Sequence, residues 1–494
     1  MKKRMIIFSV AMVFLFSIVA ERIGYVVFSG NYEVSSAHNS YTVDIDKIFE
    51  TVYDRNLNRI SNKTENLVAV IRPTEKCLTE MNKLFTYKER EEIMEELKQG
   101  YPVVKEIDHY VSCKYIKILE TTNRHPDDML AKNIVFAYEN LKPEAVGSKA
   151  INFSVDAIGR LLDGDEGNII DDNYDTKKGI SLTLDNRIQK ITEDAGADMK
   201  SGAIVVLDTD TSEVLASYST PNDYLNRAFS SYCVGSVYKL VVAACALEND
   251  INDTYECKGK VTVGDTTFTC QKDKKHGKQT IKEALANSCN CYFIDLALKL
   301  GSEKLTDISK RLGFGDVNHL YDEWNVRNGN FPNSDDLQSK GQLALLGFGQ
   351  GKLTDSPLHF SSVIAAIANG GIYKMPQLVS GSVDDSGKVS ERNENEANRA
   401  MSEDTAKTIR EYMRYVVSDG SGRSADYNNQ TAGKTSTAQS GRMEEDKEIL
   451  YTWFAGFYPY DHPKYSIVVM TEDGTSGATD CGPIFRTIVE NIEE

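Results

Sequence analysis

The longest stretch of hydrophobic positions lies at the start of the chain. Residues 2–4 are basic, residues 5–20 are uncharged and mostly apolar, and a charged pair beginning at Glu21 follows. A spanning helix needs about 17–25 residues, so this run is short, and residues 24–27 could lengthen the helix if the Arg22 side chain reaches out to the membrane surface. Because no small-x-small cleavage site precedes Glu21, we predict an uncleaved single-pass anchor in the cell membrane over residues 1–24. The basic end would be cytoplasmic and the remainder extracytoplasmic. A cleaved signal peptide is the alternative.

Residues 25–175 have a mixed pattern that suggests no chemistry. Residues 86–97 place apolar positions at helical spacing among charged ones, and a strand is expected within residues 101–118. Residues 164–178 are acidic and rich in glycine and asparagine, which is typical of a linker. We predict a small mixed α/β pedestal region here that ends in this linker and resembles a dimerisation region.

Two pairs of β-type runs mark the region 176–494. Residues 203–208 and 213–218 are separated by a short polar turn, and residues 452–458 and 465–471 form a similar pair near the C-terminus. Each pair has the pattern of a β-hairpin. Because the pairs come from opposite ends of the region, they predict one antiparallel sheet assembled from both ends.

Helical patterns lie between and after these strands. Residues 186–197 and 485–492 have helical periodicity, and residues 180–184 are a further strand candidate. Residues 384–404 are polar and acidic, which is typical of a solvated insertion. The predicted fold class is therefore α+β, with a central antiparallel sheet flanked by helices.

The composition excludes some classes of protein. The chain has 494 residues, of which 41% are hydrophobic, and this is enough for more than one domain with a sizeable core. Its formal net charge of -17 would repel phosphate groups, so no nucleic-acid partner is expected.

The cysteines suggest structural roles. The chain has nine, so an exported form keeps at least one thiol without an intramolecular partner. Cys257 and Cys270 flank a short stretch and could form a local disulfide. Cys245, Cys289 and Cys291 lie in apolar surroundings and are interpreted as small buried side chains. Since no Cys/His pair lies near Cys289 and Cys291 along the sequence, no metal site is expected.

Three short motifs occur in order along the region 176–494. They are Ser236-Val237-Tyr238-Lys239, Ser288-Cys289-Asn290 and Lys434-Thr435-Ser436-Thr437. Each motif alone is weak, because a Ser-x-x-Lys sequence arises by chance in a chain of this length and then marks only an exposed helix turn. Their order and surroundings favour a catalytic interpretation.

The first motif has the features of an activated serine nucleophile. Ser236 precedes an apolar helical pattern over residues 237–248, so it lies at a helix N-terminus, where free N–H groups favour negative charge. Lys239 is one turn further on the same face and could remove the hydroxyl proton. A lysine acts as a base only if desolvation or a second cation lowers its pKa, and Lys434 could supply that cation.

With these motifs the chain resembles the class B penicillin-binding proteins, the monofunctional peptidoglycan transpeptidases. The resemblance is dense over residues 180–494 and thin over 21–175, although Val52–Asn56 also resembles the start of the family's extracytoplasmic region. The other segments that carry it are residues 226–248, 276–277, 284–293, 348–351, 354–358, 368–371, 432–435 and 453–457. It implies a penicillin-binding, serine β-lactamase-like fold for residues 176–494 and a D,D-transpeptidase acting through an acyl-enzyme formed from D-Ala-D-Ala.

The resemblance also implies roles for the first two motifs. Ser236 would be the acylated nucleophile and Lys239 its general base. Ser288 would relay a proton to the leaving amine, and Asn290 would hold the substrate amide.

In the third motif, Lys434 would tune the proton network and, with Thr435, attract the carboxylate of the stem peptide. The backbone N–H groups of Ser236 and Thr437 would form the oxyanion hole. The family normally has glycine where this chain has Ser436. A serine there either points away from the cleft or crowds it.

The implied partners are peptidoglycan stem peptides as donor and amine acceptor, β-lactams, and a SEDS-family glycosyltransferase in the membrane. No cofactor and no metal are implied. Three alternatives remain: a D,D-carboxypeptidase, a β-lactam-sensing or lactamase-like domain, and a non-catalytic cell-wall scaffold. A bifunctional enzyme is not expected, because too few residues precede residue 180 for a glycosyltransferase domain.

Overall fold

The computed structural model describes residues 2–28, 40–156, 159–162, 164–221, 225–392 and 395–494. The chain forms two compact units. The first comprises residues 1–48, 64–122 and 146–175, and the second comprises residues 49–63, 123–145 and 176–494. The long segment of the second unit begins at residue 176, and two short segments within residues 25–175 also belong to this unit.

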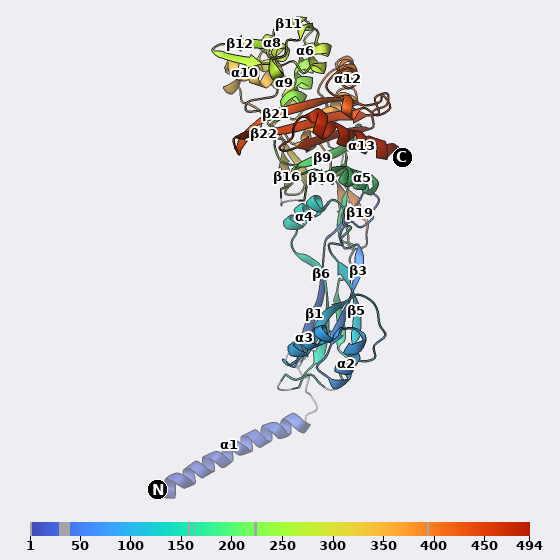
Figure 1. The fold of residues 1–494 in the computed structure, drawn as a ribbon. Helices are drawn as coiled ribbons and strands as arrows, with labels where there is room; N and C mark the ends of the chain where they lie inside the picture. The colour runs from blue at the N-terminus through green and yellow to red at the C-terminus, as the bar shows by residue number, and fades with distance from the viewer. Residues whose placement is uncertain (1, 29–39, 157–158, 163, 222–224, 393–394) are drawn as a thin grey trace. The chain divides into compact units, whose positions relative to one another are not determined.

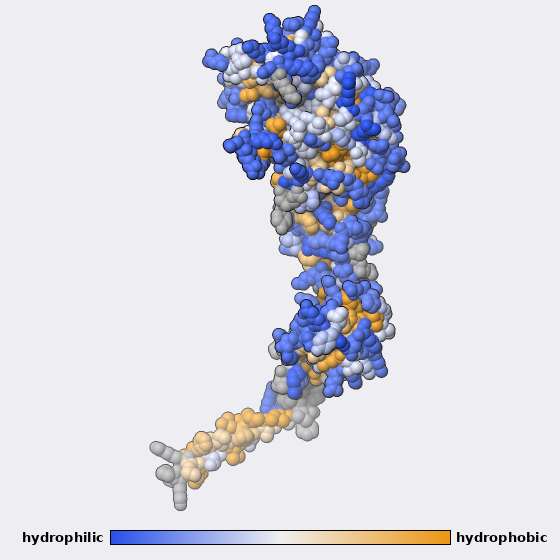
Figure 2. All heavy atoms as spheres, viewed as in Figure 1, coloured by the Kyte–Doolittle hydropathy of each residue, from blue (hydrophilic) through white to orange (hydrophobic). Residues whose placement is uncertain are grey.

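The N-terminal helix α1 (Lys2–Phe28) continues past the charged pair at residues 21–22, as the anchor requires. Residues 5–25 have a mean hydropathy of 2.2 and none of them is buried. Figure 2 shows the apolar side chains that cover this helix. Within the described residues, α1 is the one helix long and apolar enough to cross a membrane.

The rest of the first unit consists of two small sheets and two helices. The sheet orders are β1 (Ser40–Phe49), β6 (Ala145–Ser154), β7 (Asn168–Asp172) and β4 (Val103–Ile107), β3 (Thr64–Ile71), β5 (Lys117–Asn123), and the helices are α2 (Glu75–Glu80) and α3 (Tyr87–Leu97). Helix α3 begins as predicted, because Thr86 and Glu89 form a capping box. The predicted linker at 164–178 is partly wrong, since it contains β7, which pairs with β6.

A five-stranded antiparallel sheet is the centre of the second unit. Its order is β10 (Val214–Ser219), β9 (Gly202–Asp208), β23 (Tyr465–Thr471), β22 (Lys447–Tyr458), β21 (Ala432–Glu444). Both predicted hairpins are confirmed, and β23 pairs with β9, which joins the two ends of the region in one sheet (Figure 1). Strand β21 lies at the edge.

Helices cover both faces of this sheet, because successive side chains on a strand point to opposite faces. On one face, Phe454 packs against Phe485 of α13 (Gly482–Glu493), with ring centroids 4.7 Å apart, and Ile188 of α5 (Asn186–Gly196) joins the same core. On the other face, Trp453 packs near Phe360 of α11 (Pro357–Ala368). The α+β fold class is confirmed.

The remaining helices and strands complete the second unit. The helices are α4 (Lys132–Leu141), α6 (Lys239–Leu247), α7 (Ile281–Ala286), α8 (Asn290–Leu300), α9 (Ser302–Arg311), α10 (Lys340–Gly347) and α12 (Glu403–Ser418). A second sheet has the order β19 (Val389–Glu391), β18 (Val379–Val383), β8 (Gly179–Leu182), β2 (Thr51–Tyr53). Four strand pairs are β11 (Tyr255–Cys257) with β14 (Gly277–Gln279), β12 (Lys260–Val263) with β13 (Thr266–Thr269), β15 (Val317–Tyr321) with β16 (Trp324–Arg327), and β17 (Ile372–Lys374) with β20 (Ala397–Arg399). The insertion predicted over residues 384–404 therefore contains two short strands, β19 and β20.

Candidate active site

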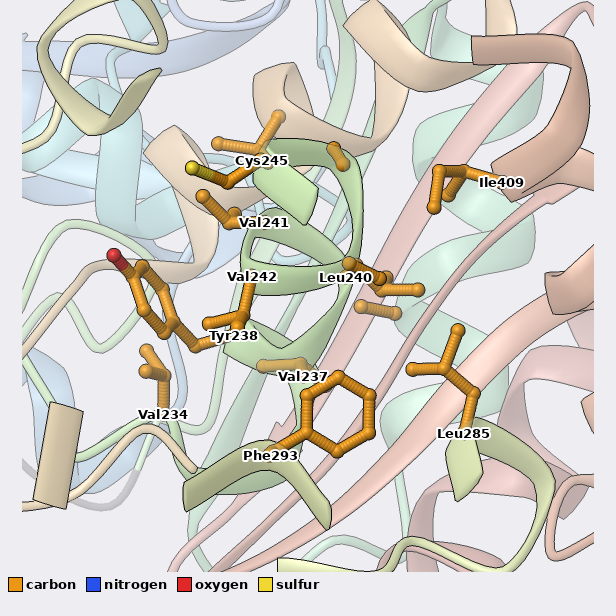
Figure 3. Packing of buried hydrophobic residues seen from close by; sticks show 14 of the residues in the cluster. Val234, Val237, Tyr238, Leu240, Val241, Val242, Cys245, Leu285, Phe293 and Ile409 are labelled. Atoms are coloured by element: carbon orange, nitrogen blue, oxygen red, sulfur yellow. The ribbon is translucent and has the colours of Figure 1, made fainter. Parts of the chain in front are cut away.

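The first motif lies on a tight turn that leads into a buried helix. Residues 235–238 form a 3-10 turn, and α6 follows it directly, so Ser236 occupies the predicted helix N-terminus. Side chains of the turn and of α6, including Val237 and Leu240, pack with Phe293 and Leu285 (Figure 3). The apolar pattern after Ser236 thus anchors the turn in the core.

Two glycines let other backbone segments approach this turn. Gly235 has a φ of +57°, in the left-handed region that glycine adopts most easily. Its N–H donates to the carbonyl of Gly349 at 2.9 Å, and a Cβ on Gly349 would overlap the Gly235 carbonyl. The indole N–H of Trp453 donates to the carbonyl of Cys233 at 3.1 Å. The segment around Ser236 is therefore held from two sides.

The second motif lies in the short loop between α7 and α8. The N–H of Ser288 donates to the Leu285 carbonyl at 3.1 Å, and that of Cys289 donates to the Ala284 carbonyl at 2.9 Å. This is the Schellman pattern, which requires a left-handed residue after the helix, and Ser288 has a φ of +51°. A side chain in this conformation costs about 1–2 kcal/mol, and such strain is common at functional sites.

Lys239 joins the first motif to the second. Its Nζ lies 2.8 Å from the Ser288 carbonyl oxygen, 2.8 Å from Asn290 Oδ1 and 3.3 Å from Ser288 Oγ. The side chain is fully buried, and burial lowers its pKa from about 10.5 to about 8, against the opposing effect of nearby cysteines. A neutral Lys239 can keep both 2.8 Å hydrogen bonds and still offer a lone pair to a hydroxyl proton.

Lys434 reaches the same serine from the sheet. Its Nζ lies 3.2 Å from Ser288 Oγ and 2.7 Å from the carbonyl oxygen of Thr435. It is also fully buried, and burial together with the charge of Lys239 holds its pKa well below the usual value. Ser288 Oγ thus lies within hydrogen-bond distance of both lysine amines.

The rest of the third motif lies beside the turn at residues 235–238. Thr435 Oγ1 is 2.7 Å from Ser421 Oγ. The side chain of Ser436 points toward the turn, since a Cβ built on Gly235 would lie 2.5 Å from its Oγ. Ser436 is 2% exposed, and its Oγ has no hydrogen-bond partner in the structure. The Ser436 side chain therefore occupies the space next to Gly235 and does not point away from the turn.

One cleft of 860 Å³ brings the motifs together. Among the residues that line it are Ser236, Ser288, Asn290, Thr435, Ser436 and Thr437. The two lysines complete the set through their hydrogen bonds to Ser288. A cleft of this volume suits a small ligand or a peptide end. All the predicted site residues are therefore in or directly behind the cleft.

Sequence analysis missed several residues that support the site. Ser421 has no recognisable motif around it, and it reaches Thr435 only because the loop after α12 returns to β21. Gly349 lies in a segment that carries the family resemblance, residues 348–351, but the sequence indicated no role for it.

The cysteines near the second motif lie close together in the structure. Cys257 and Cys270 are free thiols whose Sγ atoms lie 3.7 Å apart, so the local disulfide that the sequence allows is not formed. The sequence suggested no Cys/His partners for the cysteines at 289 and 291, but the fold brings partners to Cys289. Four side chains, which we call the thiol–imidazole cluster, have their ligand atoms within 4.8 Å of one another: Cys257, Cys270, His276 and Cys289.

Known proteins share features of this sequence. Residues 202–490 match the profile described as penicillin binding protein transpeptidase domain. The chain is 29% identical over 471 residues to stage V sporulation protein D of Bacillus subtilis. This alignment covers 88% of the chain and 71% of that protein. It is also 26% identical over 369 residues to peptidoglycan D,D-transpeptidase MrdA of Haemophilus influenzae, in an alignment that covers 63% of the chain and 56% of that protein.

The fold is also similar to solved structures. Penicillin binding protein 3 from Mycobacterium tuberculosis, complexed with ampicillin, superposes with a TM-score of 0.64 at 22% identity. The match covers 92% of this chain and 95% of that chain. At this identity the likeness supports the architecture, and it includes residues outside the 202–490 match.

Proposed function

Since the chain belongs to the penicillin-binding protein transpeptidase family, as its resemblance to the class B members predicted, we propose that it is a peptidoglycan D,D-transpeptidase. Its donor would be a stem peptide ending in D-Ala-D-Ala, its acceptor an amine of a neighbouring stem peptide, and β-lactams would inhibit it covalently. The observation that carries the proposal is the shared position of Ser288 Oγ, 3.3 Å and 3.2 Å from the two buried lysine amines.

The proposed acylation uses these groups in sequence. Ser236 Oγ attacks the carbonyl carbon of the penultimate D-Ala as its hydroxyl proton passes to neutral Lys239. The C–N bond to the terminal D-Ala then breaks, and the amine leaves with a proton delivered through Ser288. An acceptor amine attacks the Ser236 ester, loses a proton along the reverse path and frees the serine.

The edge strand supports the proposed oxyanion hole. Strand β21 has a partner on one side only, so alternate N–H groups are left free on its other side. Ser436 and Ala438 of this strand lie against Gly235 of the nucleophile turn. The N–H groups of Ser236 and Thr437 would donate to the tetrahedral oxygen, and one such donor is worth about 3–4 kcal/mol.

A direct test of the function is to incubate the detergent-solubilised chain with a D-Ala-D-Ala stem-peptide donor, with and without an amine acceptor. Mass spectrometry of the products would detect a cross-linked dimer and one free D-Ala for each cross-link. Trimmed donor without cross-links would instead favour a D,D-carboxypeptidase. No consumption of donor, in a protein that also fails to bind penicillin covalently, would favour a non-catalytic scaffold.

The location and membrane partner are part of the proposal. Helix α1 would remain as a single-pass anchor, with the catalytic unit on the extracytoplasmic side. The anchor and first unit would contact a SEDS-family glycosyltransferase that supplies glycan strands. We expect the intact mass of membrane-extracted protein to include residues 1–24, and a mature N-terminus near Glu21 would contradict the anchor.

Ser436 is expected to discriminate between ligands by size. Its side chain takes up space next to the nucleophile turn, so small penams should acylate Ser236 faster than bulky cephalosporins. The variant Ser436→Gly should lessen that preference and leave the small-lactam rate within about tenfold, or about 1.4 kcal/mol in the barrier. Second-order acylation rates for one small and one bulky lactam on both proteins provide the measurement. An unchanged ratio would show that the serine does not narrow the cleft.

A further inference from the structure

The thiol–imidazole cluster is assembled from four separate places in the fold. Cys257 ends β11, Cys270 follows β13, His276 precedes β14, and Cys289 is the N-cap of α8. The three cysteines are buried and the histidine is half-buried. The cluster adjoins the active-site cleft, because Cys270 and His276 line it.

Three of the distances within the cluster match those of a tetrahedron around one ion, and all four ligand atoms lie within 4.8 Å of one another. With a zinc–sulfur distance of about 2.3 Å, two sulfur ligands lie about 3.8 Å apart, and sulfur and nitrogen ligands about 3.6 Å apart. Cys270 Sγ lies 3.7 Å from both Cys257 Sγ and Cys289 Sγ. Cys257 Sγ lies 3.5 Å from His276 Nδ1.

We propose that the thiol–imidazole cluster binds a zinc ion. Three thiolates and one imidazole are soft, tetrahedral ligands, which favour zinc over the oxygen-seeking magnesium and calcium. Four protein ligands close the coordination sphere, so the ion has a structural role and takes no direct part in acyl transfer.

Backbone groups around the sulfurs support metal-bound thiolates. The N–H of Gly259 donates to Cys257 Sγ at 3.4 Å, and the N–H of Tyr292 donates to Cys289 Sγ at 3.4 Å. Such outer hydrogen bonds orient ligands and stabilise their negative charge. Cys291 Sγ, 3.5 Å from Cys270 Sγ, lies just outside the four ligands.

The position of the ion links it to the second motif. Cys289 lies between Ser288 and Asn290, so a metal that holds its sulfur also fixes the two side chains that contact Lys239. Asn290 Nδ2 donates to the Thr269 carbonyl at 3.1 Å, next to the ligand at 270. Zinc would thus keep the strained left-handed conformation of Ser288 in place.

Measuring the zinc content of the full chain tests whether the thiol–imidazole cluster binds zinc, and it requires no measurement of activity. Protein purified in detergent, without a metal-affinity column, should contain about one zinc per chain by plasma mass spectrometry. Cys257→Ser and His276→Ala should each lower this to below about one fifth, because each removes a ligand. Cys245→Ser, a buried cysteine of α6 outside the cluster, is the matched control and should keep the zinc.

A variant that misfolds would also lose zinc, so the binding of zinc is tested on the wild-type protein as well. A chelator should remove the zinc from it, and added zinc should restore the content where added magnesium should not. The site is overturned if wild-type protein lacks zinc, if both variants retain it, or if the zinc-free chain carries a disulfide between Cys257 and Cys270.

The positioning role is a separate readout, and it rests on the proposed function. Zinc removal should slow labelling by a fluorescent penicillin at least about tenfold, the scale on which outer-sphere changes act at metal sites. An unchanged rate after complete removal would overturn the positioning role but leave the metal site intact. A zinc-loaded protein that no penicillin labels would refute the proposed function alone.

Discussion

Replacing Ser236 with alanine is expected to abolish covalent labelling by penicillins. A β-lactam presents its strained amide to the nucleophile that would attack D-Ala-D-Ala, so no ester can form without the hydroxyl. Ser236 is only partly buried and lies on the turn that lines the cleft. Removing its oxygen should therefore change the free energy of unfolding by less than about 0.5 kcal/mol.

The experiment compares Ser236→Ala with a serine outside the cleft. Ser302 is the first residue of α9, so Ser302→Ala should label at the wild-type rate. Fluorescent penicillin on a denaturing gel measures labelling, peptide mass mapping locates the adduct, and the melting temperature confirms the fold. An adduct that persists in Ser236→Ala, mapped to another side chain, would exclude Ser236 as the nucleophile.

Replacing Lys239 with methionine should slow acylation by at least about 10²-fold, the low end for a positioned general base. Methionine fills most of the buried space but cannot accept a proton. The proposed base is the neutral amine, and burial lowers the pKa of Lys239 to about 8, so the wild-type rate should rise with pH. The rise should be about tenfold per pH unit below pH 8, with a plateau above it. The acylation rate of Lys239→Met should not show this rise with pH.

The pH profile separates the chemical role from a packing role. A methionine that merely disturbed the helix would lower the rate and leave the shape of the profile intact. Because Lys434 lies beside the same Ser288 oxygen, the observed pKa belongs to the pair of lysines. Lys340→Met, on the exposed start of α10, is the control and should change neither rate nor profile.

Elements with a strong local pattern could be predicted from the sequence. The hairpin of β9 and β10 and the hairpin of β22 and β23 form as expected, because two runs of residues typical of strands flank turn residues in each. The grouping of the motif residues could be predicted only from the family resemblance. Contacts such as that between Lys239 and Ser288 join residues far apart in the chain, and no local sequence pattern predicts them.

Features that depend on non-local pairing were missed. Strand β7 is exposed along its whole length, so it has no apolar alternation that marks it as a strand. The segment at residues 49–63 was assigned to the pedestal, but β2 pairs in parallel with β8 more than a hundred residues later. Parallel pairing leaves no turn signature in the sequence.

The thiol–imidazole cluster was missed for the same reason. Its members are spread over residues 257–289, and zinc motifs are recognised by closely spaced pairs of ligands. The left-handed conformation of Ser288 could not be predicted either, because helix ends of this kind usually have glycine at that position. Ser421 contacts Thr435 through the return of the loop after α12 to β21, and this long-range contact has no local sequence pattern.

The space between residues 235 and 436 holds the side chain of only one of them. The residue tolerated at either position therefore depends on the residue at the other. A hydroxymethyl group fits on the strand because the turn opposite carries no side chain. A lineage could therefore gain the serine only while the glycine was kept, and the serine in turn blocks any larger residue at 235. Selection by an antibiotic would then act on the two positions jointly, so the effect of a substitution at one depends on which residue the other already carries.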